Sequence, residues 1–167
     1  MNRTPLALAF ALGVLLPSAA CVADTGNKLP ADAQAVLDKA EEIELYSLDP
    51  AENADAEKPK EQFHGWRVLG KTTVTKGDKK DVVEALGKGI KGSDGSVAAC
   101  FNPRHGIRAT HDKKTVELVI CFECLSMQVF EGGEKTASVL TTATPQKTLD
   151  KVLTAAKVPL PGQADKK

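Results

Sequence analysis

Residues 100–124 read CFNPRHGIRATHDKKTVELVICFEC, and this stretch decides the fold because it holds both arms and the turn of a predicted hairpin. Strand-forming residues dominate 115–130 (TVELVICFECLSMQVF), which predicts one long, central strand. The segments 97–102 and 107–111 predict a preceding strand that Pro103 interrupts. Between the arms, Asp112-Lys113-Lys114 indicates the turn that makes the pair antiparallel.

Three of the four cysteines lie inside this stretch, together with a histidine. A reversal over residues 112–114 places His105 opposite Cys121. Cys100 and Cys124 then lie diagonally on neighbouring rungs of the same face, and a one-residue slip would exchange the two faces. Because the spacing of Cys121 and Cys124 is odd, a flat strand points them to opposite faces. A bulge or turn is needed to bring both sulfur atoms to one side.

Three interpretations of this cluster compete. In the first, Cys124 forms a disulfide with Cys100 or with Cys121, as an oxidising compartment favours. In the second, the cluster is a metal site whose donor set suits tetrahedral zinc, the one cofactor that the sequence suggests. The metal ligands would be Cys100, His105, Cys121 and Cys124. In the third, the thiols are free, buried and without chemistry.

Two further side chains are candidates for ligand binding. Arg104 lies in a tight Asn-Pro-Arg-His-Gly turn, and its planar guanidinium suits a carboxylate or phosphate. The alternative for Arg104 is an ion pair with an acidic neighbour such as Glu123. His64 completes the site if its strand lies next to the hairpin; the alternative is a partly exposed structural histidine.

The rest of the chain predicts an α+β fold with a mostly antiparallel sheet and helices packed on one face. Apolar residues at helical spacing predict helices over 31–40, 79–90 and from Pro145 onward, with Asp78 and Thr144 as N-caps. Alternating patterns predict strands over 41–48, 63–75 and 136–142, and the charged segment 49–61 predicts an exposed loop.

The N-terminal sequence MNRTPLALAFALGVLLPSAAC predicts export. A basic residue, a short apolar run and small residues are typical of a signal peptide, here residues 1–20. Cys21 follows Ser-Ala-Ala and resembles the lipidated cysteine of a bacterial lipobox, although Ser18 stands where an apolar residue is usual. Lipidation at Cys21 would make the membrane a partner; the alternative is ordinary cleavage after Ala20 or Ala23. We expect an exported protein, periplasmic or anchored to the membrane as a lipoprotein.

Behind the signal peptide we expect three segments. They are an N-terminal segment with a short helix (21–42), a single α+β domain (43–158) and a flexible tail (159–167). The charge of these segments excludes nucleic acid as a partner. The chain has 22 basic and 22 acidic residues and 4% aromatic residues, so it has neither a positive footprint nor the rings on which bases stack. The sequence specifies no protein or small-molecule partner.

Three strings of sequence together resemble a family of small exported bacterial proteins, including lipoproteins, without an assigned activity. They are the FHGW string (63–66), the CFNPRHG string (100–106) and the CFEC string (121–124). The resemblance extends from Ile43 to the final helix. It implies export and assigns no catalytic residue.

These patterns favour a non-enzymatic binding or structural domain of the cell envelope, with a Cys/His site that holds a disulfide or zinc. The alternative is a thiol–disulfide or metal-dependent enzyme that uses Cys121, Cys124 and His105. The two hypotheses differ in whether the sulfur atoms are open to solvent and close to the imidazole.

Overall fold

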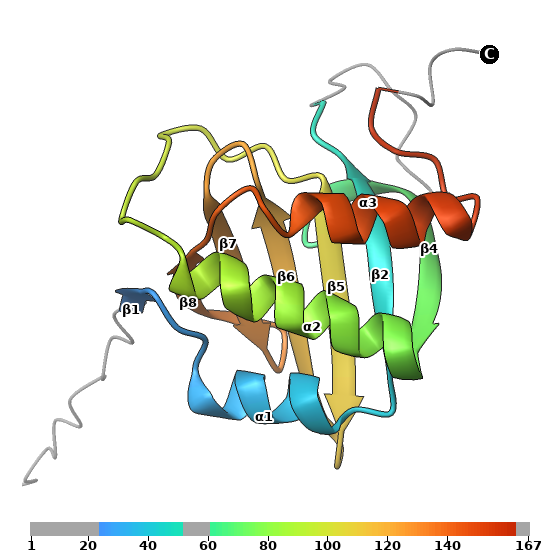
Figure 1. The fold of residues 1–167 in the computed structure, drawn as a ribbon, viewed down its shortest axis with the longest axis horizontal. Helices are drawn as coiled ribbons and strands as arrows, with labels where there is room; N and C mark the ends of the chain where they lie inside the picture. The colour runs from blue at the N-terminus through green and yellow to red at the C-terminus, as the bar shows by residue number, and fades with distance from the viewer. Residues whose placement is uncertain (1–23, 52–60, 163–167) are drawn as a thin grey trace, which may run out of the picture.

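The structure, a computed structural model, describes residues 24–51 and 61–162. Within these ranges the chain forms an eight-stranded sheet in the order β1-β8-β7-β6-β5-β2-β4-β3. Neighbouring strands are antiparallel, except that β1 and β8 are parallel. Three helices lie on one face of the curled sheet (Figure 1), which confirms the predicted α+β fold. The elements are β1 Asp24–Gly26, α1 Ala31–Lys39, β2 Glu42–Asp49, β3 Gln62–Phe63, β4 Trp66–Thr75, α2 Lys76–Lys91, β5 His105–His111, β6 Lys114–Cys121, β7 Ser126–Glu131, β8 Glu134–Leu140 and α3 Gln146–Ala155.

The main core lies between the helices and the sheet. Each helix buries an apolar stripe whose residues recur three or four positions apart, as an amphipathic helix requires. The stripe residues are Ala33, Val36 and Leu37 in α1, Val82, Leu86 and Ile90 in α2, and Leu149 and Leu153 in α3. They pack in one cluster with strand residues such as Ile107 and Leu118. Burial of each such aliphatic side chain stabilises the fold by about 1.5–3 kcal/mol.

The opposite face of the sheet has a smaller core. Its members are Tyr46, Leu48, Phe63 and Val119, with Trp66, Val68, Phe101 and Phe130 packed around them. Successive residues of a strand point to opposite faces. Adjacent residues such as Leu45 and Tyr46 are therefore both buried, one in each core.

Two strand predictions are wrong. Residues 115–130 do not form one strand: β6 ends at Cys121, the chain turns, and β7 begins at Ser126 as its antiparallel partner. Residues 97–102 form no strand, and β5 begins only at His105. Pro103 cannot donate to a β-ladder, which explains why the strand begins after it.

The predicted N-caps are also wrong. Helix α2 follows Thr75, so Asp78 lies in its first turn, where its charge suits the helix dipole. Helix α3 follows Pro145, and Thr144 lies in the preceding turn rather than at the cap position. The predicted strand 63–75 is instead a hairpin, in which β3 turns at His64 and Gly65 and pairs with β4. The remaining predicted elements agree with the structure apart from shifts at their ends, while most of the expected loop 49–61 lies outside the described residues.

Candidate functional site

The FHGW, CFNPRHG and CFEC strings meet at one end of the sheet, where β4 and β5 begin and β6 ends. The rings of Trp66 and Phe101 lie edge to face with their centroids 6.5 Å apart. The rings of His105 and Phe122 do the same at 5.3 Å. Three segments that are far apart in the sequence therefore form one structural unit.

Gly106 supplies the space into which the FHGW string packs. A Cβ atom on Gly106 would lie 2.7 Å from Cε1 and 2.8 Å from Cδ1 of Phe63, closer than real Cβ contacts. The Phe63 ring stacks on Tyr46 with centroids 4.3 Å apart. The missing side chain at position 106 thus lets the β3–β4 hairpin reach across β2 toward β5.

The CFEC string closes a disulfide between Cys121 and Cys124, whose Cα atoms lie 5.1 Å apart. The β6–β7 turn brings them together, and Leu125 in this turn adopts a φ of 54°. This confirms one of the two predicted disulfide pairings and the need for a turn between the cysteines. Both cysteines have 0% exposure, so the bond is sealed from solvent.

The third cysteine of the predicted cluster, Cys100, is free and exposed. Cys100 lies in the irregular segment 92–104 between α2 and β5. This segment is bound to the disulfide by two backbone N–H groups. That of Ala98 donates to the carbonyl of Cys124 at 3.2 Å, and that of Asn102 donates to the Cys124 Sγ atom at 3.4 Å.

His105 lies on the helix face of the sheet, away from the disulfide. The β5–β6 ladder pairs His105 with Ile120 rather than with Cys121, one residue from the predicted register. The cause is a two-residue turn at Asp112 and Lys113, whose φ values of 48° and 65° suit a tight hairpin, where a three-residue reversal was expected. This slip moves the ring to the other face.

On the helix face, His105 connects the sheet to α3. Its Nε2 atom lies 2.8 Å from Oδ1 of Asp150, and the side chain is only 1% exposed. Ser47 lies directly across on β2. The Ser47 Oγ and His105 Nδ1 atoms are buried and have no hydrogen-bond partner among the described residues.

The predicted metal set is not assembled. Cys121 and Cys124 bond to each other, His105 lies on the other face, and Cys100 is exposed. Among the residues that the structure describes, no three His, Cys, Asp or Glu side chains are placed to hold a metal ion. The predicted convergence of the four side chains was wrong, because the observed register turns His105 to the other face and because residues 97–102, which carry Cys100, form no strand.

Of the two ligand-binding candidates, Arg104 pairs with Glu123. One of its terminal nitrogens lies 2.7 Å from Oε1 of Glu123. This contact is the ion pair predicted as the alternative to ligand binding. It links the CFNPRHG string to the CFEC string at the partly exposed rim of the site.

His64 lies over the opposite face of the sheet, in the turn of the β3–β4 hairpin. Its Nε2 atom lies 2.9 Å from Oε2 of Glu117, and its ring stacks on Phe130 with centroids 3.7 Å apart. Arg108 donates from Nε to Oε1 of the same Glu117 at 2.7 Å. His64 is thus engaged with strands β6 and β7 and is partly buried.

The His64 contacts continue into a polar network that the sequence analysis did not identify. A terminal nitrogen of Arg108 donates to the Tyr46 hydroxyl at 2.8 Å, and this hydroxyl donates to Oε2 of Glu44 at 2.7 Å. Two signals were present: Glu44 and Tyr46 share a face of one strand, and Arg108 and Glu117 are opposite charges on facing strands.

The surroundings shift the pKa values of three members of the network, Tyr46, Glu44 and Arg108. Burial raises the pKa of the Tyr46 hydroxyl far above its ordinary value, and the hydrogen bond to Glu44 raises it further. Burial also raises the pKa of Glu44, but the hydrogen bond from Tyr46 and the charge of Lys71 outweigh it, so the net pKa lies below 4.5. Burial lowers the pKa of Arg108, and the hydrogen bond to Glu117 helps to raise it overall.

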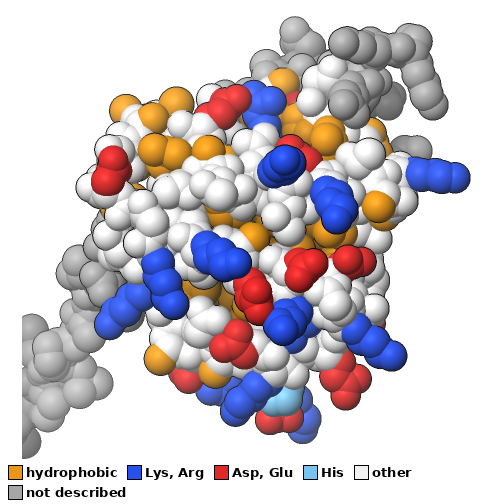
Figure 2. Space-filling model, in the orientation of Figure 1, with side chains coloured by type: hydrophobic (Ala, Val, Ile, Leu, Met, Phe, Trp, Pro, Cys, Tyr) orange, Lys and Arg blue, Asp and Glu red, His pale blue; other side chains and the backbone are white. Residues whose placement is uncertain are grey.

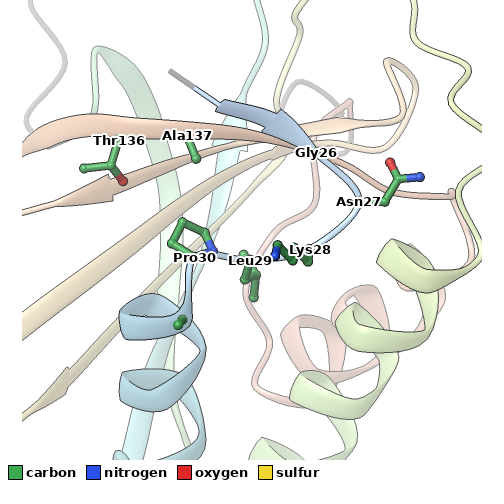
Figure 3. A pocket seen from close by; sticks show the side chains of 8 residues that line it. Gly26, Asn27, Lys28, Leu29, Pro30, Thr136 and Ala137 are labelled. Carbon is green, nitrogen blue, oxygen red and sulfur yellow. The ribbon is translucent and has the colours of Figure 1, made fainter. Parts of the chain in front are cut away.

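The surface of the helix face carries charged side chains of both signs. Figure 2 shows basic and acidic side chains interspersed over the helices. A hollow of about 540 Å³ lies between the segment 26–31 and β8, with Thr136 and Ala137 in its lining (Figure 3). Lys28 is its one charged lining residue, and none of the predicted site residues lines it.

Comparison with models of protein families, with curated proteins and with solved structures finds no match for this chain. The resemblance carried by the three strings therefore stays a prediction. Cys21 and the predicted signal peptide lie outside the described residues. None of the helices in the described ranges is long and apolar enough to cross a membrane.

Proposed function

We propose that this protein is an exported domain of the bacterial cell envelope with a binding or structural role. The observation that carries the binding or structural role is that the reactive groups of the three strings, apart from the free thiol of Cys100, are engaged with partners. Arg104 and His105 each have a carboxylate partner, and the sulfur atoms of the CFEC string are joined and buried. A nucleophilic or acid–base catalyst needs such a group accessible to its substrate.

The network on the opposite face supports the same proposal. The pKa shifts of Tyr46 and Glu44 move both groups away from neutrality, so neither exchanges protons readily near pH 7. Arg108 already binds Glu117, Glu44 and Tyr46. These groups stabilise the hairpin over the sheet.

The enzyme alternative, which uses Cys121, Cys124 and His105, is less well supported. The imidazole lies on the other face of the sheet from Cys121, and it binds Asp150. The imidazole is therefore not placed to activate either thiol. The oxidising envelope also favours a structural disulfide at this position.

The compartment is tested by expression of the full chain in a bacterial host and fractionation of the cells. We expect the wild-type protein in the membrane fraction and Cys21→Ser in the soluble periplasm, with Cys100→Ser as a control that stays with the membrane. Intact mass should show a lipid on the mature chain that begins at Cys21. A chain that keeps residues 1–20 and stays in the cytoplasm would contradict export.

The state of the sulfur atoms is tested on the purified mature domain by thiol counting and metal analysis. We expect one free thiol and no stoichiometric zinc. Bound zinc would support the metal interpretation. Three free thiols without metal would contradict both the disulfide and the metal interpretation. Catalytic reduction of an added protein disulfide would support the enzyme alternative and contradict a purely binding or structural role.

A further inference from the structure

We propose that Cys100 relays thiol–disulfide exchange between solvent and the buried Cys121–Cys124 bond. The external partner is a small soluble thiol or, in the reverse direction, its disulfide. This inference goes beyond the proposed binding or structural role and does not depend on it, because it concerns how the domain's own disulfide is reduced and formed.

The first argument is access. Cys121 and Cys124 are each 0% exposed, so an external thiolate cannot approach either sulfur atom in line with the bond while the domain is folded. Cys100 is exposed and unpaired within the described part of the chain. Any thiol in solution therefore meets Cys100 before it meets the disulfide.

The second argument is proximity. The segment that covers the disulfide is the one that carries Cys100. Asn102 donates its N–H to the Cys124 Sγ atom at 3.4 Å, and Ala98 donates to the Cys124 carbonyl at 3.2 Å. In the sequence, Cys100 is two residues from each of these contacts. Two residues of extended chain span at most about 7 Å, which places the Cα atom of Cys100 within about 10 Å of the Cys124 sulfur.

The third argument is that residues 96–100 lie outside the sheet, while the next residue, Phe101, packs against Trp66 and anchors the segment beside the disulfide. Residues 96–104 contain no helix or strand until β5 begins. Sulfur is a weak hydrogen-bond acceptor, so the bond from Asn102 to Cys124 is weak. A shift that brings Cys100 onto Cys124 therefore leaves the sheet and its ladders intact.

The chemistry follows from these positions. The Cys100 thiolate attacks Cys124 Sγ; a Cys100–Cys124 bond forms, the Cys121–Cys124 bond breaks, and the electron pair leaves on Cys121. A hydrogen bond stabilises the negative charge on the leaving sulfur, because the backbone N–H of Cys124 donates to Cys121 Sγ at 3.1 Å. A hydrogen bond to the charged form of a group favours that form.

The external thiol completes the reduction. Its thiolate attacks Cys100 Sγ in the new bond, which forms a mixed disulfide and releases Cys124 as a thiolate. A second external thiolate then attacks the external sulfur of this mixed disulfide. The two external thiols leave as one disulfide, and the Cys100 thiolate is restored. Two external thiols are oxidised to one disulfide, and the protein disulfide is reduced to two thiols. The same steps in reverse oxidise the Cys121–Cys124 pair.

The relay is tested by the rate at which reduced glutathione opens the disulfide of the folded mature domain, followed by alkylation and mass spectrometry. We expect Cys100→Ser to slow the reaction about tenfold or more, because the tethered thiol is lost. Val97→Ser, an exposed change on the same segment, should keep the wild-type rate. Equal rates in wild type and Cys100→Ser would overturn the relay.

A trapped intermediate gives a second, independent measurement. Cys121→Ser leaves Cys100 and Cys124, which should pair as an internal disulfide in a glutathione redox buffer. Cys124→Ser is the matched control and should leave Cys100 and Cys121 mostly unpaired. Unpaired thiols in Cys121→Ser would overturn the proposal, as would equal pairing in both variants, since Cys124 would then not be the sulfur attacked. Circular dichroism of each variant shows whether the fold is retained.

Discussion

A single methyl group at position 106 should destabilise this fold. Gly106→Ala places a Cβ atom 2.7 Å and 2.8 Å from two ring atoms of Phe63, and 3.3 Å from Cβ of Tyr46. The Phe63 ring is 2% exposed and stacks on Tyr46, so it has little room to retreat. Overpacking of this kind in a filled core costs about 1–3 kcal/mol, and we expect a loss of stability in that range.

Gly87→Ala is the matched control. A Cβ on Gly87 meets nothing within 4 Å, and the residue lies inside α2. Alanine is favoured over glycine in a helix by about 1 kcal/mol, so this variant should be more stable than wild type. Opposite signs at Gly106 and Gly87 separate a packing clash from a general effect of replacing glycine.

Urea unfolding followed by circular dichroism measures both effects, and a double mutant locates their cause. In a Phe63→Leu background the smaller side chain leaves room for the new methyl group, so Gly106→Ala should cost much less than in wild type. Coupling between residues in contact reaches about 0.5–3 kcal/mol. A Gly106→Ala midpoint equal to wild type, or a loss that Phe63→Leu leaves unchanged, would refute the reasoning.

Three further predictions concern the same end of the sheet and its network. Replacement of both Cys121 and Cys124 by serine removes a cross-link around a four-residue loop, which the chain-entropy relation values at about 2 kcal/mol; an unchanged free energy of unfolding would contradict this. Asp150→Ala leaves the buried Nε2 atom of His105 without a partner and should cost about 1–3 kcal/mol. Asp150→Asn keeps an acceptor oxygen and should cost less, so equal losses in thermal unfolding would argue against the contact. Folding lowers the pKa of Glu44, so its contribution is complete above pH 4.5 and is lost as the pH falls through the lower folded value. Glu44→Gln should therefore flatten the acid side of the stability curve, and a curve parallel to wild type would contradict the assignment.

The fold class could be predicted from the sequence because its signals are local. Apolar residues three and four positions apart specify helices wherever the sheet lies, and α1 and α2 formed close to the expected ranges. The Arg104–Glu123 pair was also within reach, since both residues flank the predicted hairpin. The hairpin of β6 and β7 was missed because the apolar pattern continues through its turn without a glycine, proline or asparagine to mark it.

The register of the β5–β6 hairpin could not be predicted from its turn residues alone. Asp112 and Lys113 both adopt positive φ, a conformation more usual for glycine or asparagine, and neither of those residues stands in the turn to mark its length. The observed register pairs Arg108 with Glu117 and Ile107 with Leu118, which matches charge with charge and apolar with apolar. Cross-strand complementarity was therefore a better guide to register than the turn residues.

In the observed register the three strings form no shared chemical centre, and most of their residues have structural roles. Gly106 admits the Phe63 ring, His105 holds α3 through Asp150, and the cysteine pair fixes the β6–β7 turn. Each of these residues has a packing role that accounts for its presence. Cys100 has none that the described contacts reveal: its side chain is exposed and its sulfur is free. An exposed, unpaired thiol on the segment that covers a sealed disulfide is the arrangement that the proposed exchange requires.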